Sequence, residues 1–101
     1  MKTPELASAE LRLLAGVFQP HPEIKEVKLF GSRATGTSSP ASDIDLAVWG
    51  EVDALGTEAI AAELDELPTP YKFDLKAFHL IQLPALREHI ERVGITVYPM
   101  G

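Results

Sequence analysis

The chain has 101 residues, with 9 Lys and Arg residues against 15 Asp and Glu residues, and we expect a single domain over residues 1–101 because this length supports one hydrophobic core. The net charge of -6 argues against direct nucleic-acid binding, which draws its affinity from basic side chains that neutralise phosphates. No apolar run reaches the roughly 20 residues of a membrane span and the N-terminus lacks a signal-peptide pattern, so we expect a cytoplasmic protein without a membrane anchor.

The first half of the chain alternates between helical and extended patterns. Apolar residues at helical spacing predict a first helix over residues 3–19, ended by prolines, and an apolar segment predicts a strand over residues 25–30. Residues 31–36 are expected to open a short helix, and the small, polar residues 37–42 a loop. Residues 43–49 have strand periodicity, with one apolar face and one face that is acidic at one end.

The second half repeats this alternation. Residues 53–67 are rich in Ala, Glu and Leu and predict a helix that covers a sheet, stopped by prolines. Period-two alternation predicts a strand over residues 71–78, followed by a helix over residues 84–93 and a last short strand over residues 95–98. The order α-β-α-β-α-β-α-β predicts an α/β or α+β fold, in which helices flank a small sheet.

Two acids on the second predicted strand are the first candidates for chemistry. Period two places Asp43 and Asp45 on one face, with Cα atoms about 6 to 7 Å apart. Carboxylates brought to about 4 Å repel by roughly 1 kcal/mol in water and nearer 4 kcal/mol at a protein surface, so we expect a cation to offset them. Oxygen ligands in a chain without cysteine favour Mg²⁺ or Mn²⁺. Because Mg²⁺ is usually shared with substrate phosphates, the pattern predicts a phosphate-bearing substrate.

The turn after the first predicted strand offers donors for such phosphates. Gly31 lets the backbone approach a phosphate without a Cβ in the way, and the Ser32 hydroxyl can add a donor. A helix that begins here would also direct free N–H groups toward an anion. Arg33 could clamp a second phosphate oxygen, or could instead pair with Glu26 or another surface acid. No Lys-Ser or Lys-Thr pair follows Gly36, which excludes a P-loop.

The glycine turn and the acids have a characteristic spacing: Gly31-Ser32, ten intervening residues, Asp43-Ile44-Asp45 and a single acid on the third predicted strand. This pattern resembles the signature of the DNA polymerase β-like nucleotidyltransferase superfamily. The run from Gly31 to Gly36 and the closing segment over residues 91–98 are most similar to its minimal branch, the MNT antitoxin-type domain. The resemblance implies the nucleotidyltransferase fold, a small mixed β-sheet flanked by helices.

The resemblance also implies the roles of the three acids. Asp43 and Asp45 match the metal-binding acids, and Asp74 matches the third carboxylate on the neighbouring strand. All three would be catalytic residues and metal ligands in a two-metal transfer at the α-phosphate of ATP, with Mg²⁺ or Mn²⁺ as the cation. Asp74 would receive, or help remove, the proton of the attacking hydroxyl.

Gly31 and Ser32 match the family's triphosphate-binding turn, and Arg33 follows them directly. Thr35 stands where many members have a second Arg, a departure that bears on one contact to the triphosphate or acceptor and not on the metal site. The nucleoside triphosphate is therefore expected to lie over residues 31–33.

The same branch is similar to the antitoxin half of HEPN/MNT toxin–antitoxin pairs, which implies transfer of AMP from ATP to a tyrosine of a HEPN RNase partner. Two alternatives remain open: a non-catalytic antitoxin that inhibits its partner by contact alone, and a small-molecule nucleotidyltransferase of the aminoglycoside-modifying kind. The second would need a further domain to hold the acceptor, for which 101 residues leave no room. So small a domain encloses a nucleotide incompletely, so we expect a homo- or hetero-oligomer.

Other polar and aromatic residues have plainer interpretations. Trp49 ends a core strand and is interpreted as a cap on the apolar layer, with stacking on a nucleotide base as the alternative. Lys76 is a possible ion-pair neighbour of Asp74. The Glu-rich helix over residues 53–67 is interpreted as a solvated face. Surface or turn roles suffice for the three histidines, His21, His79 and His89.

Overall fold

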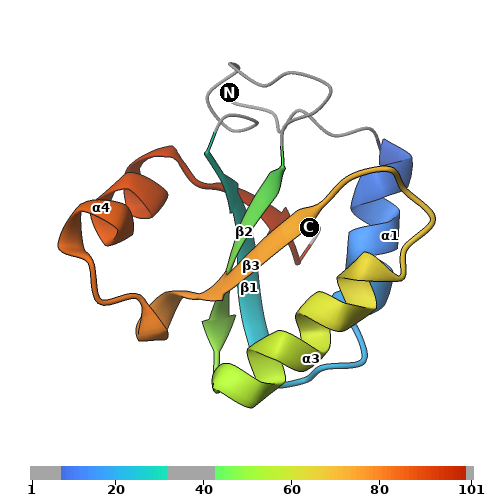
Figure 1. The fold of residues 1–101 in the computed structure, drawn as a ribbon, viewed down its shortest axis with the longest axis horizontal. Coiled ribbons are helices and arrows are strands. Elements are labelled where there is room, and N and C mark those ends of the chain that lie inside the picture. Colours follow the sequence, from blue (N-terminus) through green and yellow to red (C-terminus); the bar gives the residue numbers. More distant parts are fainter. Residues whose placement is uncertain (1–7, 32–42, 100–101) are drawn as a thin grey trace.

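The computed structural model describes residues 8–31 and 43–99. Helices lie on both sides of a four-stranded sheet (Figure 1). The elements in chain order are α1 (Ser8–Phe18), β1 (Ile24–Phe30), β2 (Ile44–Gly50), α3 (Ala54–Asp65), β3 (Phe73–Ala77), the short 3-10 helix η1 (Phe78–Leu80), α4 (Pro84–Val93) and β4 (Ile95–Tyr98).

The sheet is mixed, with the strand order β3-β2-β1-β4. β1 is antiparallel to both of its neighbours, whereas β2 and β3 are parallel and are connected through α3. The predicted fold, a small mixed sheet flanked by helices, is therefore confirmed. Because of these directions, the end of β1 and the starts of β2 and β3 lie at the same end of the sheet. We call this end, which carries Asp43, Asp45 and Asp74, the acidic edge.

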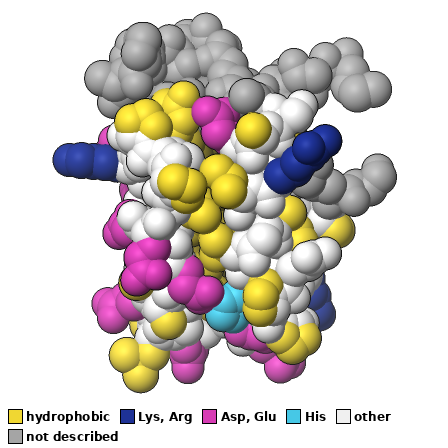
Figure 2. Space-filling model, turned by 90° about the vertical axis from the view of Figure 1, so that its right-hand side faces the viewer, with side chains coloured by type: hydrophobic (Ala, Val, Ile, Leu, Met, Phe, Trp, Pro, Cys, Tyr) yellow, Lys and Arg dark blue, Asp and Glu magenta, His cyan; other side chains and the backbone are white. Residues whose placement is uncertain are grey.

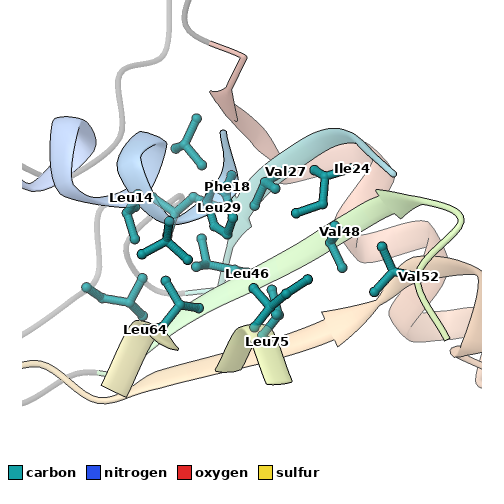
Figure 3. Close-up of a cluster of buried hydrophobic side chains, with 14 of the residues drawn as sticks. Leu14, Phe18, Ile24, Val27, Leu29, Leu46, Val48, Val52, Leu64 and Leu75 are labelled. Carbon is teal, nitrogen blue, oxygen red and sulfur yellow. The ribbon is translucent and has the colours of Figure 1, made fainter. Parts of the chain in front are cut away.

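One face of the sheet carries the larger part of the core, beneath α1 and α3 (Figure 3). Leu14 and Phe18 on α1 and Ile60 and Leu64 on α3 lie four residues apart, which puts each pair on one side of its helix. The strands contribute alternate residues to the same layer. Buried strand side chains in this cluster are those of Ile24, Val27, Leu29, Ile44, Leu46, Val48, Leu75, Ala77 and Val97.

The opposite face is covered by α4 and η1, which lie on the other side of the sheet from α1 and α3 (Figure 1). Its smaller cluster of buried residues is Phe30, Ala47, Phe78, Ile90 and Val93. Asp45 alternates with the core residues of β2 and so shares this face with Ala47. The acid face predicted for β2 therefore lies on the α4 side.

The structure differs from the sequence-based prediction after β3. That strand ends at Ala77 rather than at residue 78, and Phe78 begins η1, which the alternating pattern did not predict. Arg87 on α4 holds this turn, because its Nη1 donates to the carbonyl oxygens of Phe78 and Ile81, each at 3.0 Å. The tertiary contact, not the local pattern, ends the strand here.

The remaining boundaries agree within a few residues. Asp53 caps α3 by accepting from the Gly56 backbone N–H at 2.7 Å, and α3 ends at Asp65, before the predicted residue 67. The predicted helix start at residues 3–7, the short helix after Gly31 and the loop over residues 37–42 lie outside the described residues.

The face formed by α1 and α3 has hydrophobic side chains along its middle and acidic side chains toward its lower part (Figure 2).

His21, in the turn before β1, joins this turn to α3: its Nδ1 lies 3.3 Å from Glu23 Oε2 and its Nε2 lies 2.8 Å from Glu63 Oε2. His21 thus has a turn role, one of the two roles suggested for the histidines. None of the helices in the described part of the chain has the length and apolar character to cross a membrane.

Candidate functional site

Three predicted acids lie together at the acidic edge. Asp45 on β2 is the register partner of Asp74 on β3, and parallel strands place such partners about 4.8 Å apart with side chains on the same face. Asp43 precedes the first residue of β2 and is exposed. The Asp74 side chain is 48% exposed, so it points toward solvent and not into the interior. The structure therefore brings Asp45 of β2 and Asp74 of β3 to one surface.

The electrostatics of this surface are unbalanced toward negative charge. Burial raises the pKa of Asp45 above its ordinary value of 3.8, and the neighbouring charges of Asp74 and then Asp43 raise it further. Lys76 acts in the opposite direction and lowers the Asp45 pKa. Three carboxylates thus face one ammonium group, and the surplus negative charge favours binding of a cation.

Lys76 forms the ion pair with Asp74 that the sequence suggested. Its Nζ lies 3.1 Å from Oδ1 and 2.9 Å from Oδ2 of Asp74, so both oxygens of this carboxylate are engaged. In the described part of the chain, no three His, Cys, Asp or Glu side chains are gathered closely enough to hold one metal ion. The acids nevertheless offer the oxygen ligands that Mg²⁺ and Mn²⁺ prefer, with a surplus of negative charge. Metal binding by these three acids stays a prediction.

Gly31 forms the turn that leaves β1, directly beside Asp45. Its φ of 76° lies in the left-handed region, where side chains other than glycine's are strained. A Cβ at this position would also collide with Asp45 Oδ2. The predicted phosphate-binding turn and the predicted metal-binding acid are therefore in close contact. The other residues assigned to this turn, Ser32 and Arg33, lie outside the described residues, as does Thr35.

An aromatic stack occupies the α4 face at the opposite end of β2. Trp49 stacks on Phe78 with ring centroids 4.5 Å apart, and Lys28 Nζ lies 5.3 Å from the centroid of the indole. The guanidinium of Arg87 covers Phe78 at 4.3 Å. Trp49 thus caps the apolar layer, as interpreted from the sequence. Its neighbour Arg87 was missed, since a lone Arg on an amphipathic helix carries no distinguishing signal.

Two further histidines lie on the α4 side. His89 meets Phe30 edge-on, with ring centroids 6.5 Å apart at an interplanar angle of 82°. Phe30 is the register partner of Asp45, so this contact supports the β1 end that precedes Gly31. His79 is exposed in η1. His79 occupies a surface position, as the sequence suggested, whereas the packing contact of His89 was not predicted.

One protein-family model matches most of the chain. The family model described as "Polymerase beta, Nucleotidyltransferase" matches residues 13–100. No curated protein matches the chain with significance.

Several solved structures share the fold. A crystal structure of a toxin–antitoxin with AMP-PNP has a TM-score of 0.74 and 22% identity, covering 87% of this chain and 72% of that chain. A complex of a tri-AMPylated Shewanella oneidensis HEPN toxin with an MNT antitoxin has a TM-score of 0.61 and 18% identity, covering 89% of this chain and 70% of that chain. A structure named for a minimal nucleotidyltransferase has a TM-score of 0.59 and 26% identity, covering 86% and 88%.

Proposed function

The chain belongs to the polymerase β nucleotidyltransferase family, and from this premise we propose that it transfers AMP from ATP to a tyrosine hydroxyl of a HEPN-domain toxin and so acts as its antitoxin. The observation that carries the proposal is the pairing of Asp45 with Asp74 across parallel strands, directly beside the Gly31 turn. We infer that residues 1–101 work as one domain in the cytoplasm.

The choice of substrate and partner is supported by the structural relatives. One similar toxin–antitoxin structure contains AMP-PNP, an ATP analogue, which supports ATP as the nucleotide. Another relative is an MNT antitoxin in complex with a tri-AMPylated HEPN toxin, which supports a HEPN protein as acceptor and AMP as the transferred group. For this chain, the partner would complete the enclosure of the nucleotide, so we expect a hetero-oligomer as the working form.

The acids at the edge would hold two Mg²⁺ ions, with Mn²⁺ able to replace them. Asp43 and Asp45 would bind these cations, and Asp74 would be a ligand of the ion nearer the acceptor. Divalent cations at this position supply electrostatic stabilisation of the phosphate oxygens. The raised pKa of Asp45 is consistent with this use. It shows that burial and nearby negative charges destabilise the ionised carboxylate, and a bound cation would offset the repulsion.

The chain's own residues would then position the reactants. The backbone at Gly31, with Ser32 and Arg33, would hold the triphosphate so that its α-phosphate faces the acids. Asp74 would accept or help remove the proton of the tyrosine hydroxyl as the new O–P bond forms, while the bond to pyrophosphate breaks and pyrophosphate leaves. The 48% exposure of the Asp74 side chain suits an acceptor that is itself part of a protein.

Mass spectrometry of the HEPN protein tests the proposal directly. Co-expression with this chain is expected to add the mass of AMP to a tyrosine-containing peptide of the partner. The Asp43→Asn/Asp45→Asn variant is expected to abolish both the adduct and the neutralisation of the toxin. Asp65→Asn is the matched control, because Asp65 is an exposed acid on α3, on the other side of the sheet.

The same variant distinguishes a non-catalytic antitoxin. If toxin neutralisation survives in Asp43→Asn/Asp45→Asn while the adduct disappears, inhibition works by contact alone. Absence of any adduct with the unaltered chain, in the presence of ATP and Mg²⁺, would overturn the proposed transfer to protein. Labelled AMP on an added aminoglycoside would instead indicate a small-molecule acceptor.

A further inference from the structure

Lys76 is placed by the sheet so that its ammonium meets the acidic edge. It lies two residues beyond Asp74 on the same face of β3, and its register partner on β2 is Ala47. Because the methyl group of Ala47 offers no polar partner, the ammonium reaches back along the strand to Asp74, at 2.9 and 3.1 Å from the two carboxylate oxygens. The Lys76 and Asp74 side chains are 36% and 48% exposed, so the contact lies at the protein surface.

The charge of Lys76 also reaches Asp45. Burial, Asp74 and Asp43 all disfavour ionisation of Asp45, and Lys76 opposes them. A single ammonium thus offsets part of the repulsion among carboxylates from two strands. A divalent cation bound at this edge would have the same effect, with twice the charge.

We propose that Lys76 is a built-in counter-ion of the acidic edge, which holds Asp74 in the metal-free protein and is displaced when a divalent cation takes Asp74 as a ligand. The inference rests on the proposed function, because it assumes that Asp74 is a ligand. Both oxygens of Asp74 contact the Lys76 ammonium, so a cation that takes this carboxylate as a ligand has to compete with Lys76. It follows that Lys76 weakens metal binding relative to the acids alone.

Mn²⁺ titration without nucleotide tests this role, with binding measured by calorimetry and by the electron paramagnetic resonance signal of free Mn²⁺. Lys76→Gln is expected to bind Mn²⁺ roughly three- to tenfold more tightly than the unaltered chain, because the competing ammonium is gone. Lys76→Arg keeps the charge and is expected to stay near the unaltered affinity. Lys25→Gln is the matched control: it removes the same charge from an exposed position at the start of β1, which is the end of that strand remote from the acidic edge.

Thermal unfolding gives a second readout that does not depend on catalysis. Without metal, Lys76→Gln is expected to melt below the unaltered chain, because the acids lose their counter-ion. Saturating Mn²⁺ should then raise its melting temperature by more than it raises that of the unaltered chain. Lys25→Gln should show neither change.

The outcomes separate this inference from the proposed function. Equal or weaker Mn²⁺ binding by Lys76→Gln would overturn the counter-ion role while leaving the metal site intact. No Mn²⁺ binding by either chain would overturn the metal site, and the counter-ion role with it. Tighter binding that is also seen in Lys25→Gln would show a general charge effect and would equally overturn the specific role of Lys76.

Discussion

The backbone of Gly31 lies directly against the carboxylate of Asp45, at the point where the end of β1 meets the start of β2. The left-handed φ of Gly31 favours glycine at this position, and a Cβ here would also require the Asp45 carboxylate to shift. The turn assigned to the triphosphate and the acid assigned to the metal therefore depend on each other.

Gly31→Ala is expected to damage both stability and transfer. The added methyl group would strain the backbone and push Asp45 aside, so we expect a loss of about 1–3 kcal/mol in the free energy of unfolding and at least a tenfold fall in AMP transfer. Gly16→Ala is the control, because a Cβ on this α1 residue meets nothing within 4 Å and alanine favours a helix. Denaturant unfolding and a labelled-ATP assay check both; unaltered values for Gly31→Ala would contradict the close contact.

Asp45→Asn is expected to stabilise the metal-free protein at neutral pH. The pKa of Asp45 is raised on folding, so its contribution to stability is fully present below the ordinary value of 3.8 and is lost as the pH rises through the raised pKa. Asparagine does not ionise, so the variant should melt at a higher temperature than the unaltered chain at neutral pH. The difference should vanish in acid, where the aspartate is protonated. A lower melting temperature for Asp45→Asn at neutral pH would contradict this account.

Asp74→Asn is expected to slow transfer with little effect on ATP binding. Loss of a proton acceptor typically costs about 10²- to 10⁴-fold in rate, and the Gly31 turn that holds the triphosphate stays in place. Single-turnover transfer and equilibrium binding of ATP measure the two effects separately. Transfer at the unaltered rate would remove the assignment of Asp74 as base and leave the roles of Asp43 and Asp45 standing.

Arg87→Met is expected to destabilise the protein without changing the site. Its Nη1 bonds two backbone carbonyls around η1, and their loss should cost about 1–3 kcal/mol. Arg92→Met is the control, since the Arg92 side chain is 67% exposed and its Nε lies 3.9 Å from Glu88 Oε1, a surface pair that contributes little. Thermal melts should separate the two variants, whereas transfer per folded molecule should be equal; matching melts would show that η1 does not need Arg87.

Much of the fold could be predicted from local pattern. The second strand, α4 and β4 lie within a residue of their predicted bounds, because alternation, helical spacing, Pro84 and Gly94 mark them clearly. The end of β3 could not be predicted in this way. Phe78 continues the alternation of its strand, and only the contacts of Arg87 and Trp49 show why the chain turns there.

The residues of the candidate site could be predicted from the sequence, but their contacts across strands could not. Period two placed Asp43 and Asp45 on one face, whereas the pairing of Asp45 with Asp74 depends on β2 and β3 being parallel neighbours. Only the family resemblance indicated that Asp74 lies on the strand beside Asp45, because no local pattern shows which strands are neighbours. The contact between position 31 and the Asp45 carboxylate depends on strand register, which no local pattern contains.

The aromatic stack on the α4 face allows unfolding to be followed by intrinsic tryptophan fluorescence. The chain has one tryptophan, and its ring lies between Phe78 and Lys28 at the end of β2 remote from the acids. Indole emission should therefore follow detachment of α4 from the sheet during unfolding. Adding ATP or Mn²⁺ should leave the native signal unchanged, so fluorescence melts of every variant above can be compared without correction for ligand quenching.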